Sequence, residues 1–256
     1  MPDVLLGWLY HVDIDGSPSY DRLAVIGIMS ADPVEIAKPL FDKLQLHEVH
    51  NGIRRDFHCG SLDGRDVVLM SCGVGKVRAA ARTQYLIDHF RISSIIFTGV
   101  AGALNPELAM GDIVVSKEVM EHDFCISGTP ELDRSVAHKY QADSFLINLA
   151  LAAGERLGLG EKMRVGTVLT GDQVVAEKTR KQALWEMYCG DCVEMEGAAV
   201  GMVCWMNEVP FVLIRAISDR ADESILKDHP IWLGEAIERA SAVVLEMIGD
   251  LLEDVK

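Results

Sequence analysis

Short runs rich in Val and Ile alternate with longer stretches of helical periodicity, and this alternation limits the folds open to the chain. The apolar runs are a few residues long, as are strands buried on both faces of a sheet. Alternating strands and helices predict an α/β fold with a mostly parallel sheet covered by helices on both faces. The candidate strands are Leu23–Met29, Val67–Ser71, Ser94–Thr98, Ile113–Ser116, Arg164–Leu169 and Pro210–Ile217. The candidate helices are Val34–Leu46, Lys76–Phe90, Ser144–Leu157, Glu177–Met187, Gly197–Asn207 and Ile231–Leu252.

The charge balance excludes several classes of partner. The 256 residues include 39 Asp and Glu against 24 Lys and Arg, a net charge of −15. Such a surface disfavours nucleic acid, whose binding depends on neutralising phosphates, and it disfavours an anionic membrane surface. The chain has no apolar run of about 20 residues, and its first ten residues lack the basic start of a signal peptide. We therefore predict a cytoplasmic protein with neither nucleic acid nor membrane as partner.

Polar or glycine-rich segments follow four of the predicted strands. They are Ser30–Glu35, Gly73–Lys76, Gly99–Gly102 and Ser218–Asp219. Because ligands of α/β sheets bind outside the carboxyl ends of the strands, we expect these segments to converge on one crevice. The least patterned stretch, Asp123–Asp143, is predicted to be a loop or lid.

Acidic residues stand where apolar runs end. Glu194 and Glu196 flank Met195, so an extended segment places both carboxylates on one side, whereas an early turn lets one of them cap the next helix. Asp219 follows Ser218 at the end of the last predicted strand and is compatible with a turn or a helix cap. Glu35 is compatible with an ordinary glutamate of a first helical turn. Carboxylates held at strand ends also suit general acid–base chemistry and the binding of sugar hydroxyls.

Two other motifs are weaker. Gly73-Val74-Gly75 starts like a dinucleotide-binding turn, but Arg78 stands where the third glycine belongs and no acidic residue ends the next strand. A tight turn with close backbone approach is favoured, and no cofactor is predicted. Cys189 and Cys192 have CxxC spacing but follow a helical stretch and have no second cysteine pair, which disfavours a redox or zinc role.

Taken together and in this order, these segments resemble the 5′-methylthioadenosine/S-adenosylhomocysteine nucleosidases of the purine nucleoside phosphorylase and nucleosidase family. The similarity begins near Leu23, which leaves residues 1–22 as an N-terminal extension and 23–256 as a single nucleosidase domain. The specific signals are Val193–Ala199 and Val209–Asp222, whereas Ile26–Met29 with Glu35 is weak when taken alone. The other matching segments are Gly73–Val77, Thr98–Gly102, Gly111–Ser116, His122-Asp123 and Gly171-Asp172.

The resemblance implies a three-layer α/β/α sandwich with a twisted mixed central sheet. It also implies hydrolysis of the N-ribosidic bond of a 5′-substituted purine nucleoside, which releases adenine, with neither cofactor nor metal. Asp219 would deliver a proton toward purine N7, and Glu35 would orient the attacking water with Arg215 beside it. Glu196 would accept the ribose hydroxyls. A homodimer and a part in methionine salvage are implied as well.

The resemblance further implies which residues contact the substrate. Met195 would pack on the sugar, the backbone of Val175 would bind the purine edge, and Ser218 would orient Asp219. Val174 replaces an aromatic residue that usually stacks on the purine, and Val100 replaces a usual serine. The predicted substrate-binding residues are Met195, Glu194, Val174, Val175, Ser218 and Val100.

Three alternatives stay open. A phosphorylase needs cationic or hydroxyl groups for phosphate, but Phe97 and Val100 stand where many phosphorylases have arginine and serine. With Glu35 opposite, charge repulsion favours water over phosphate as the nucleophile. A futalosine-type nucleosidase fits the absence of the usual aromatic residues after His122-Asp123. A nucleoside-binding protein without catalysis is the third alternative, because a fold does not guarantee a function.

Overall fold

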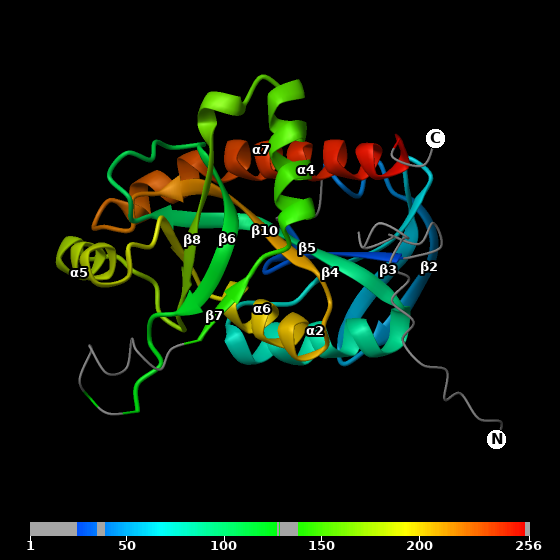
Figure 1. Ribbon diagram of the computed structural model, residues 1–256, viewed down its shortest axis with the longest axis horizontal. Coiled ribbons are helices and arrows are strands. Elements are labelled where there is room, and N and C mark those ends of the chain that lie inside the picture. Colours follow the sequence, from blue (N-terminus) through cyan, green and yellow to red (C-terminus); the bar gives the residue numbers. More distant parts are fainter. Residues whose placement is uncertain (1–24, 35–38, 127, 129–137, 254–256) are drawn as a thin grey trace.

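The computed structural model describes residues 25–34, 39–126, 128 and 138–253, which form a mixed sheet between two layers of helices (Figure 1). The predicted N-terminal extension lies outside the described residues. The strands are β1 (Val25–Ser30), β2 (Gln45–Gly52), β3 (Arg55–Leu62), β4 (Arg65–Ser71), β5 (Ile92–Ala103), β6 (Ile113–Glu121), β7 (Lys139–Gln141), β8 (Met163–Thr170), β9 (Cys192–Glu194) and β10 (Phe211–Asp219). The helices are α2 (Lys76–Phe90), α4 (Ser144–Arg156), α5 (Lys178–Tyr188), α6 (Gly197–Met206) and α7 (Ile225–Glu253), with a 3-10 turn, η1 (Gly160–Lys162).

Part of the sheet closes on itself. The strand order is β10-β6-β8-β9-β5-β1-β4-β3-β2, and β10 also pairs with β5. The long strand β5 makes this closure possible, because its first half pairs with β1 and its last two residues pair with β9. Gly102 of β5 is the partner of both Asp219 on β10 and Val193 on β9. Two of the predicted acidic segments are therefore joined through one glycine.

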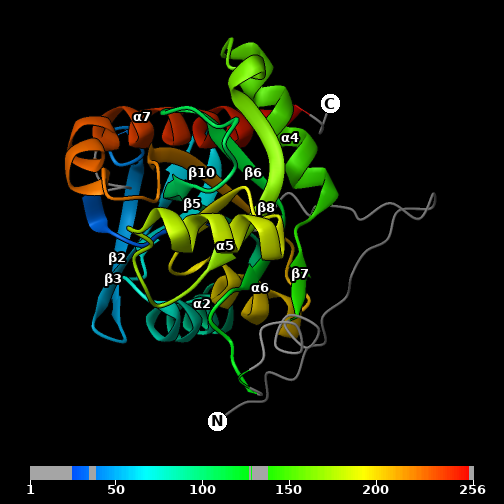
Figure 2. The same cartoon turned by 90° about the vertical axis from the view of Figure 1, so that its left-hand side faces the viewer.

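Alternation along the central strands divides the core between two helical layers. Phe211, Leu213 and Ile217 of β10 belong to a cluster with residues of α2 and α6. Val212 and Ile214 belong to a second cluster with residues of α4 and α7. Figures 1 and 2 show α2 and α6 below the sheet and α4 and α7 above it, with α5 beyond one edge. The predicted three-layer sandwich with a twisted mixed central sheet is confirmed.

The structure corrects several boundaries and adds strands that the periodicity did not predict. The predicted helix Val34–Leu46 is wrong at its end, since residues 39–43 form turns and β2 begins at Gln45; residues 35–38 lie outside the described part. The hairpin of β2 and β3, together with antiparallel pairing of β6 and β10, makes the sheet mixed rather than mostly parallel. Strand β7 lies in the predicted loop Asp123–Asp143, of which residues 127 and 129–137 are also outside the description.

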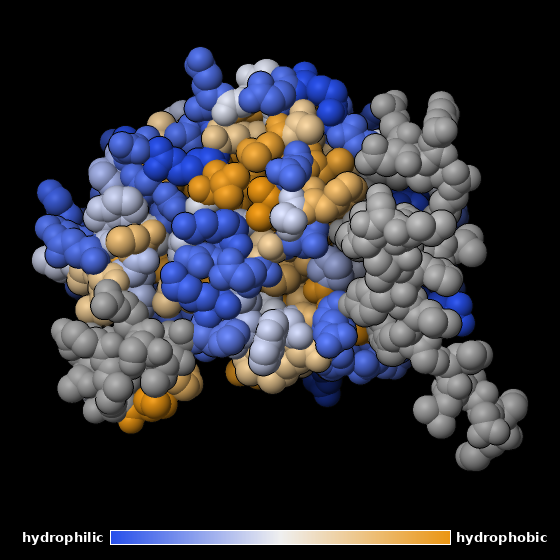
Figure 3. Space-filling model, in the orientation of Figure 1, coloured by the Kyte–Doolittle hydropathy of each residue, from blue (hydrophilic) through white to orange (hydrophobic). Residues whose placement is uncertain are grey.

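Hydrophilic residues cover most of the face shown in Figure 3, and hydrophobic residues gather in its upper centre, where α4 runs in Figure 1. None of the helices in the described part of the chain combines the length and apolar character that crossing a membrane requires.

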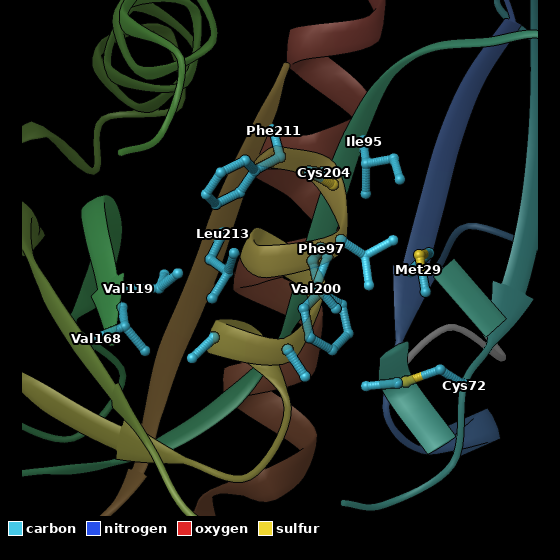
Figure 4. Close-up of a cluster of buried hydrophobic side chains, with 14 of the residues drawn as sticks. Met29, Cys72, Ile95, Phe97, Val119, Val168, Val200, Cys204, Phe211 and Leu213 are labelled. Carbon is cyan, nitrogen blue, oxygen red and sulfur yellow. The ribbon is translucent and has the colours of Figure 1, made fainter. Parts of the chain in front are cut away.

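The buried faces of β10 generate a first prediction. Leu213 is fully buried among residues of β5, β6 and α6 (Figure 4). Leu213→Ala leaves a cavity, and we expect the free energy of unfolding to fall by about 2–5 kcal/mol in urea titrations. The matched control is Val77→Ala, because the Val77 side chain on α2 is 79% exposed, and its effect should stay within about 0.5 kcal/mol. Equal effects of the two changes would contradict this assignment of the core.

Candidate active site

A cavity of about 580 Å³ opens at the carboxyl ends of β1, β5 and β10. All four predicted strand-end segments contribute to its lining, through Asp32, Val74, Val100 and Asp219 among others. The convergence predicted from the sequence is therefore found for the described residues. Glu35 lies outside them, so its predicted place beside Arg215 and the attacking water stays a prediction.

A buried ion pair lies beneath the turn that carries the two glutamates. Nη2 of Arg215 donates to Oε2 of Glu194 over 2.6 Å, and the two side chains are 1% and 4% exposed. The guanidinium also lies over the ring of Phe97, 4.1 Å from its centroid. Arg215 shares the side of β10 that faces α6, which explains why it points into this layer. Two buried charges are stable only when they are paired and hydrogen-bonded, and this pair is both.

Glu194 holds the start of α6. Its oxygens accept the backbone N–H of Gly197 at 2.9 and 2.8 Å and the backbone N–H of Glu196 at 3.1 Å. The hydroxyl of Thr170 donates to the same carboxylate. A carboxylate at a helix N-terminus satisfies free N–H groups and meets the positive end of the dipole. Of the two arrangements predicted for the glutamates, the structure therefore has the one in which a glutamate caps the helix, and Glu194 acts mainly through the turn that it fixes.

Glu196 points the other way, toward the glycine turn. Its Oε1 accepts the backbone N–H of Gly75 over 2.7 Å, and it lines the cavity. Gly75 has φ 100°, a region that favours glycine. The turn predicted at Gly73-Val74-Gly75 is thus confirmed, and its backbone approaches a carboxylate of the same chain.

Three acidic residues, Glu121, Asp123 and Asp172, hold Lys76, the residue that follows this turn. The Lys76 backbone N–H donates to Asp172, and its ammonium donates to Asp123 over 2.6 Å and to Glu121 over 2.8 Å. Asp123 in turn accepts the Asp172 N–H over 2.8 Å. Burial disfavours the charged forms of Lys76 and Asp123, but these hydrogen bonds outweigh it, so the pKa of Asp123 is lowered and that of Lys76 is raised. The motifs His122-Asp123 and Gly171-Asp172 therefore position the glycine turn.

Asp219 ends β10 beside a register shift in the pairing with β5. Its Oδ1 accepts the backbone N–H of Ala221 over 2.9 Å, and its Oδ2 accepts the hydroxyl of Ser218 over 2.9 Å. Irregularities of this kind often redirect a side chain at an active site. The Ser218 contact agrees with the predicted orienting role. A Cβ at Gly102 would lie 2.7 Å from Oδ1, which explains the glycine at this position of β5.

The remaining predicted binding residues line the same cavity with different exposure. Val174 is 63% exposed, whereas Val175 is 5% exposed. Met195 and Val100 are half-buried. Phe124, which directly follows His122-Asp123, is 42% exposed and is not among the described residues that line the cavity.

Charge in the cavity is strongly one-sided. Its described lining carries the acids Asp32, Glu194, Glu196 and Asp219, and the only basic side chain among these lining residues is His229. Sequence reasoning missed both Asp32 and His229. Asp32 could have been predicted, because it lies in the segment after the first strand. His229 could not, because the apolar periodicity predicted that its helix begins at Ile231, after this residue.

The CxxC pair has no support as a redox dithiol. All the cysteines among the described residues are free. Cys192 is fully buried on β9, and burial raises the pKa of its thiol well above the ordinary value, which disfavours the reactive thiolate. Cys189 is exposed at the end of α5.

Comparison with known proteins agrees with this geometry. A model of the phosphorylase superfamily matches residues 25–249. The 5′-methylthioadenosine/S-adenosylhomocysteine nucleosidase of Shewanella frigidimarina is 33% identical over 90% of this chain and 100% of its own length. The aminodeoxyfutalosine nucleosidase of Campylobacter jejuni is 29% identical over 88% of this chain and 97% of its own. The crystal structure of the Colwellia psychrerythraea methylthioadenosine/adenosylhomocysteine nucleosidase with adenine has a TM-score of 0.82 and 32% identity, and it covers 91% of this chain and 98% of its own.

The α/β/α fold and the carboxylate-lined cavity, with these matches, define a member of the phosphorylase superfamily. Within that superfamily the chain belongs to the family of 5′-methylthioadenosine/S-adenosylhomocysteine nucleosidases. The comparisons confirm the predicted family and the predicted class of enzyme, a purine nucleosidase.

The buried ion pair generates a second prediction. Arg215→Met leaves the Glu194 carboxylate buried without its cation, and we expect the free energy of unfolding to fall by about 3–5 kcal/mol. Adding Glu194→Gln should restore part of this loss, because a neutral amide needs no cation. Urea unfolding of the two variants measures both effects. An Arg215→Met protein as stable as the wild type would show that the Arg215–Glu194 pair does not stabilise the fold.

Proposed function

We propose that this protein hydrolyses the N-ribosidic bond of a 5′-substituted purine nucleoside of the methylthioadenosine and adenosylhomocysteine type and releases adenine. The observation that carries the proposal is a cavity in which the Ser218–Asp219 pair and the Glu196 carboxylate face one space. Asp219 ends β10, whereas Glu196 lies between β9 and the start of α6, and both line a cavity of about 580 Å³.

In the proposed reaction, the carboxyl group of Asp219 gives its proton to N7 of the purine. The bond between C1′ and N9 breaks, its electron pair goes to the purine, and the sugar acquires oxocarbenium character. A water oxygen then bonds to C1′ and loses a proton to Glu35, whose place in this mechanism rests on the sequence. Glu196 accepts the ribose hydroxyls, and Met195 packs against the sugar. Splitting acid and base duties between separate carboxylates is a recurring solution.

The charge of the cavity supports water over phosphate as the nucleophile. A phosphate ion needs arginine, lysine or hydroxyl donors, whereas the described lining carries four acids, a single histidine and the hydroxyl of Ser218, which donates to Asp219. Arg215, in the middle of β10, is buried and donates to Glu194. A phosphate in this space would meet repulsion with little compensation.

A futalosine-type nucleosidase is the second candidate. Apolar side chains at the cavity are exposed, with Val34 at 59%, Val174 at 63% and Leu226 at 89%. Such an open apolar border accommodates a 5′ substituent larger than a methylthio group. The similarity to the Campylobacter jejuni aminodeoxyfutalosine nucleosidase supports this candidate too.

The proposal includes the setting of the enzyme. We infer a cytoplasmic homodimer that takes part in methionine salvage. The net charge of −15 supports solubility. The hydrophobic area over α4 in Figure 3 supports self-association.

A panel of nucleosides in phosphate-free buffer tests the reaction. We expect release of free adenine from methylthioadenosine, adenosylhomocysteine or 5′-deoxyadenosine, which chromatography measures. Faster release from aminodeoxyfutalosine than from methylthioadenosine would favour the second candidate. Base release that strictly requires added phosphate would establish a phosphorylase, and tight binding without release would establish a binding protein.

The assignment of the acid generates a further prediction. Asp219→Asn should lower kcat by at least about 10²-fold, because the amide has no proton of suitable acidity to give to N7. Asp66→Asn, an exposed position on β4, is the matched control and should retain wild-type turnover. Wild-type turnover in the Asp219 variant would remove Asp219 from the mechanism.

A further inference from the structure

His229 occupies a place that the proposed mechanism does not use. It lies in the first turns of α7, lines the cavity, and brings its Nδ1 to 3.1 Å from the hydroxyl oxygen of Ser218. The same Nδ1 is 3.6 Å from Oδ2 of Asp219. The imidazole thus approaches both members of the pair to which the proton donor belongs.

Hydrogen-bond chemistry fixes the direction of this contact when Asp219 is an anion. The carboxylate can only accept, so the Ser218 hydroxyl donates to it. The hydroxyl oxygen then has a free lone pair, which accepts the Nδ1–H of His229. A chain from imidazole through hydroxyl to carboxylate results, and it is completed at the moment when Asp219 has lost its proton.

We propose that His229 is a positioning residue for the general acid. It holds the Ser218 hydroxyl against Asp219, and its imidazolium form stabilises the aspartate that proton transfer to the purine leaves behind. This inference rests on the proposed function and extends it. Stabilising a charge that develops during the reaction speeds the chemical step without tightening substrate binding.

The surroundings leave His229 as the group suited to this task. Of the acids in the cavity lining, Glu194 is neutralised by Arg215 and Glu196 accepts from Gly75. Asp32, on the segment after β1, accepts the backbone N–H of Val34 over 2.8 Å.

Charged groups outside the cavity have hydrogen-bond partners other than Asp219. Asp228, beside His229 on α7, accepts from Ser224 and Arg220. Lys181 on α5 interacts electrostatically with Asp219 and Asp222, but its ammonium donates to the Arg220 carbonyl. The His229 side chain is 39% exposed, so its proton exchanges with water while Asp219, at 7%, stays sheltered.

Two substitutions separate the hydrogen bond of His229 from its charge. His229→Phe keeps a ring and removes both, and we expect kcat to fall by roughly tenfold or more with little change in KM. His229→Asn places an amide donor near the position of Nδ1 and should recover most of kcat at high pH. His47→Phe, at an exposed position on β2, is the control and should leave kcat unchanged.

The pH profile gives the readout that a merely structural role would not move. The charge is present only while the imidazole is protonated, and protonation is favoured at acid pH. The ratio of wild-type kcat to that of either variant should therefore be largest near the acid end and fall as the pH rises. For His229→Asn, the ratio of wild-type kcat to variant kcat should approach one at high pH. A ratio that is independent of pH, or a His229→Phe enzyme with wild-type kcat, would overturn the proposal.

A spectrum tests the contact without turnover. In ¹⁵N-histidine-labelled protein, Ser218→Ala should move the Nδ1 resonance of His229, and His47→Phe should not. A wild-type protein that releases no base would refute the proposed function, and the spectrum would still decide the contact. An Nδ1 resonance of His229 that does not move in Ser218→Ala would refute the contact between His229 and Ser218.

Discussion

The pairing of Arg215 with Glu194 is the interaction on which the site depends. Glu194 in turn accepts the backbone N–H groups of Glu196 and Gly197 at the start of α6, and it thereby fixes the direction in which the Glu196 side chain points. Because both charges are buried, neither can be satisfied by water, and each requires the other in place. The Arg215–Glu194 pair therefore holds the turn before α6 from inside the fold, while Glu196 and Asp219 line the cavity.

The sheet brings these parts together through a change of partner. Strand β5 pairs first with β1 and at its end with β9, while β10 runs along its other side. Gly102 stands where the three strands meet, and its missing side chain leaves the space that Asp219 occupies. The acid is sheltered for this reason, and the two specific acidic motifs, separated by about twenty residues in the sequence, become neighbours.

Much of this arrangement could be predicted. The helix Lys76–Phe90 was located at its observed bounds, and the four strand-end segments do converge, because buried Val- and Ile-rich strands and amphipathic helices have distinct periods. The hairpin of β2 and β3 was missed because β2 is largely exposed and rich in polar residues, so it lacks an apolar run. Strand β9 is only three residues long, and it forms because β5 and β8 supply its partners. The start of α7 was placed too late because Pro230 stands within it.

Local patterns and short motifs along the chain are enough to specify the α/β class, the family, and the acidic residues that end the strands. The task of each acid, in contrast, depends on which groups the folded chain brings beside it. Glu194 and Glu196 have the same chemistry and are two residues apart, yet one meets a buried guanidinium and the other a glycine turn and the cavity. His229 joins Ser218 and Asp219 for the same reason. Charge and hydrogen bonding act across a few ångströms in space, and the spacing of residues along a chain does not specify which groups meet there.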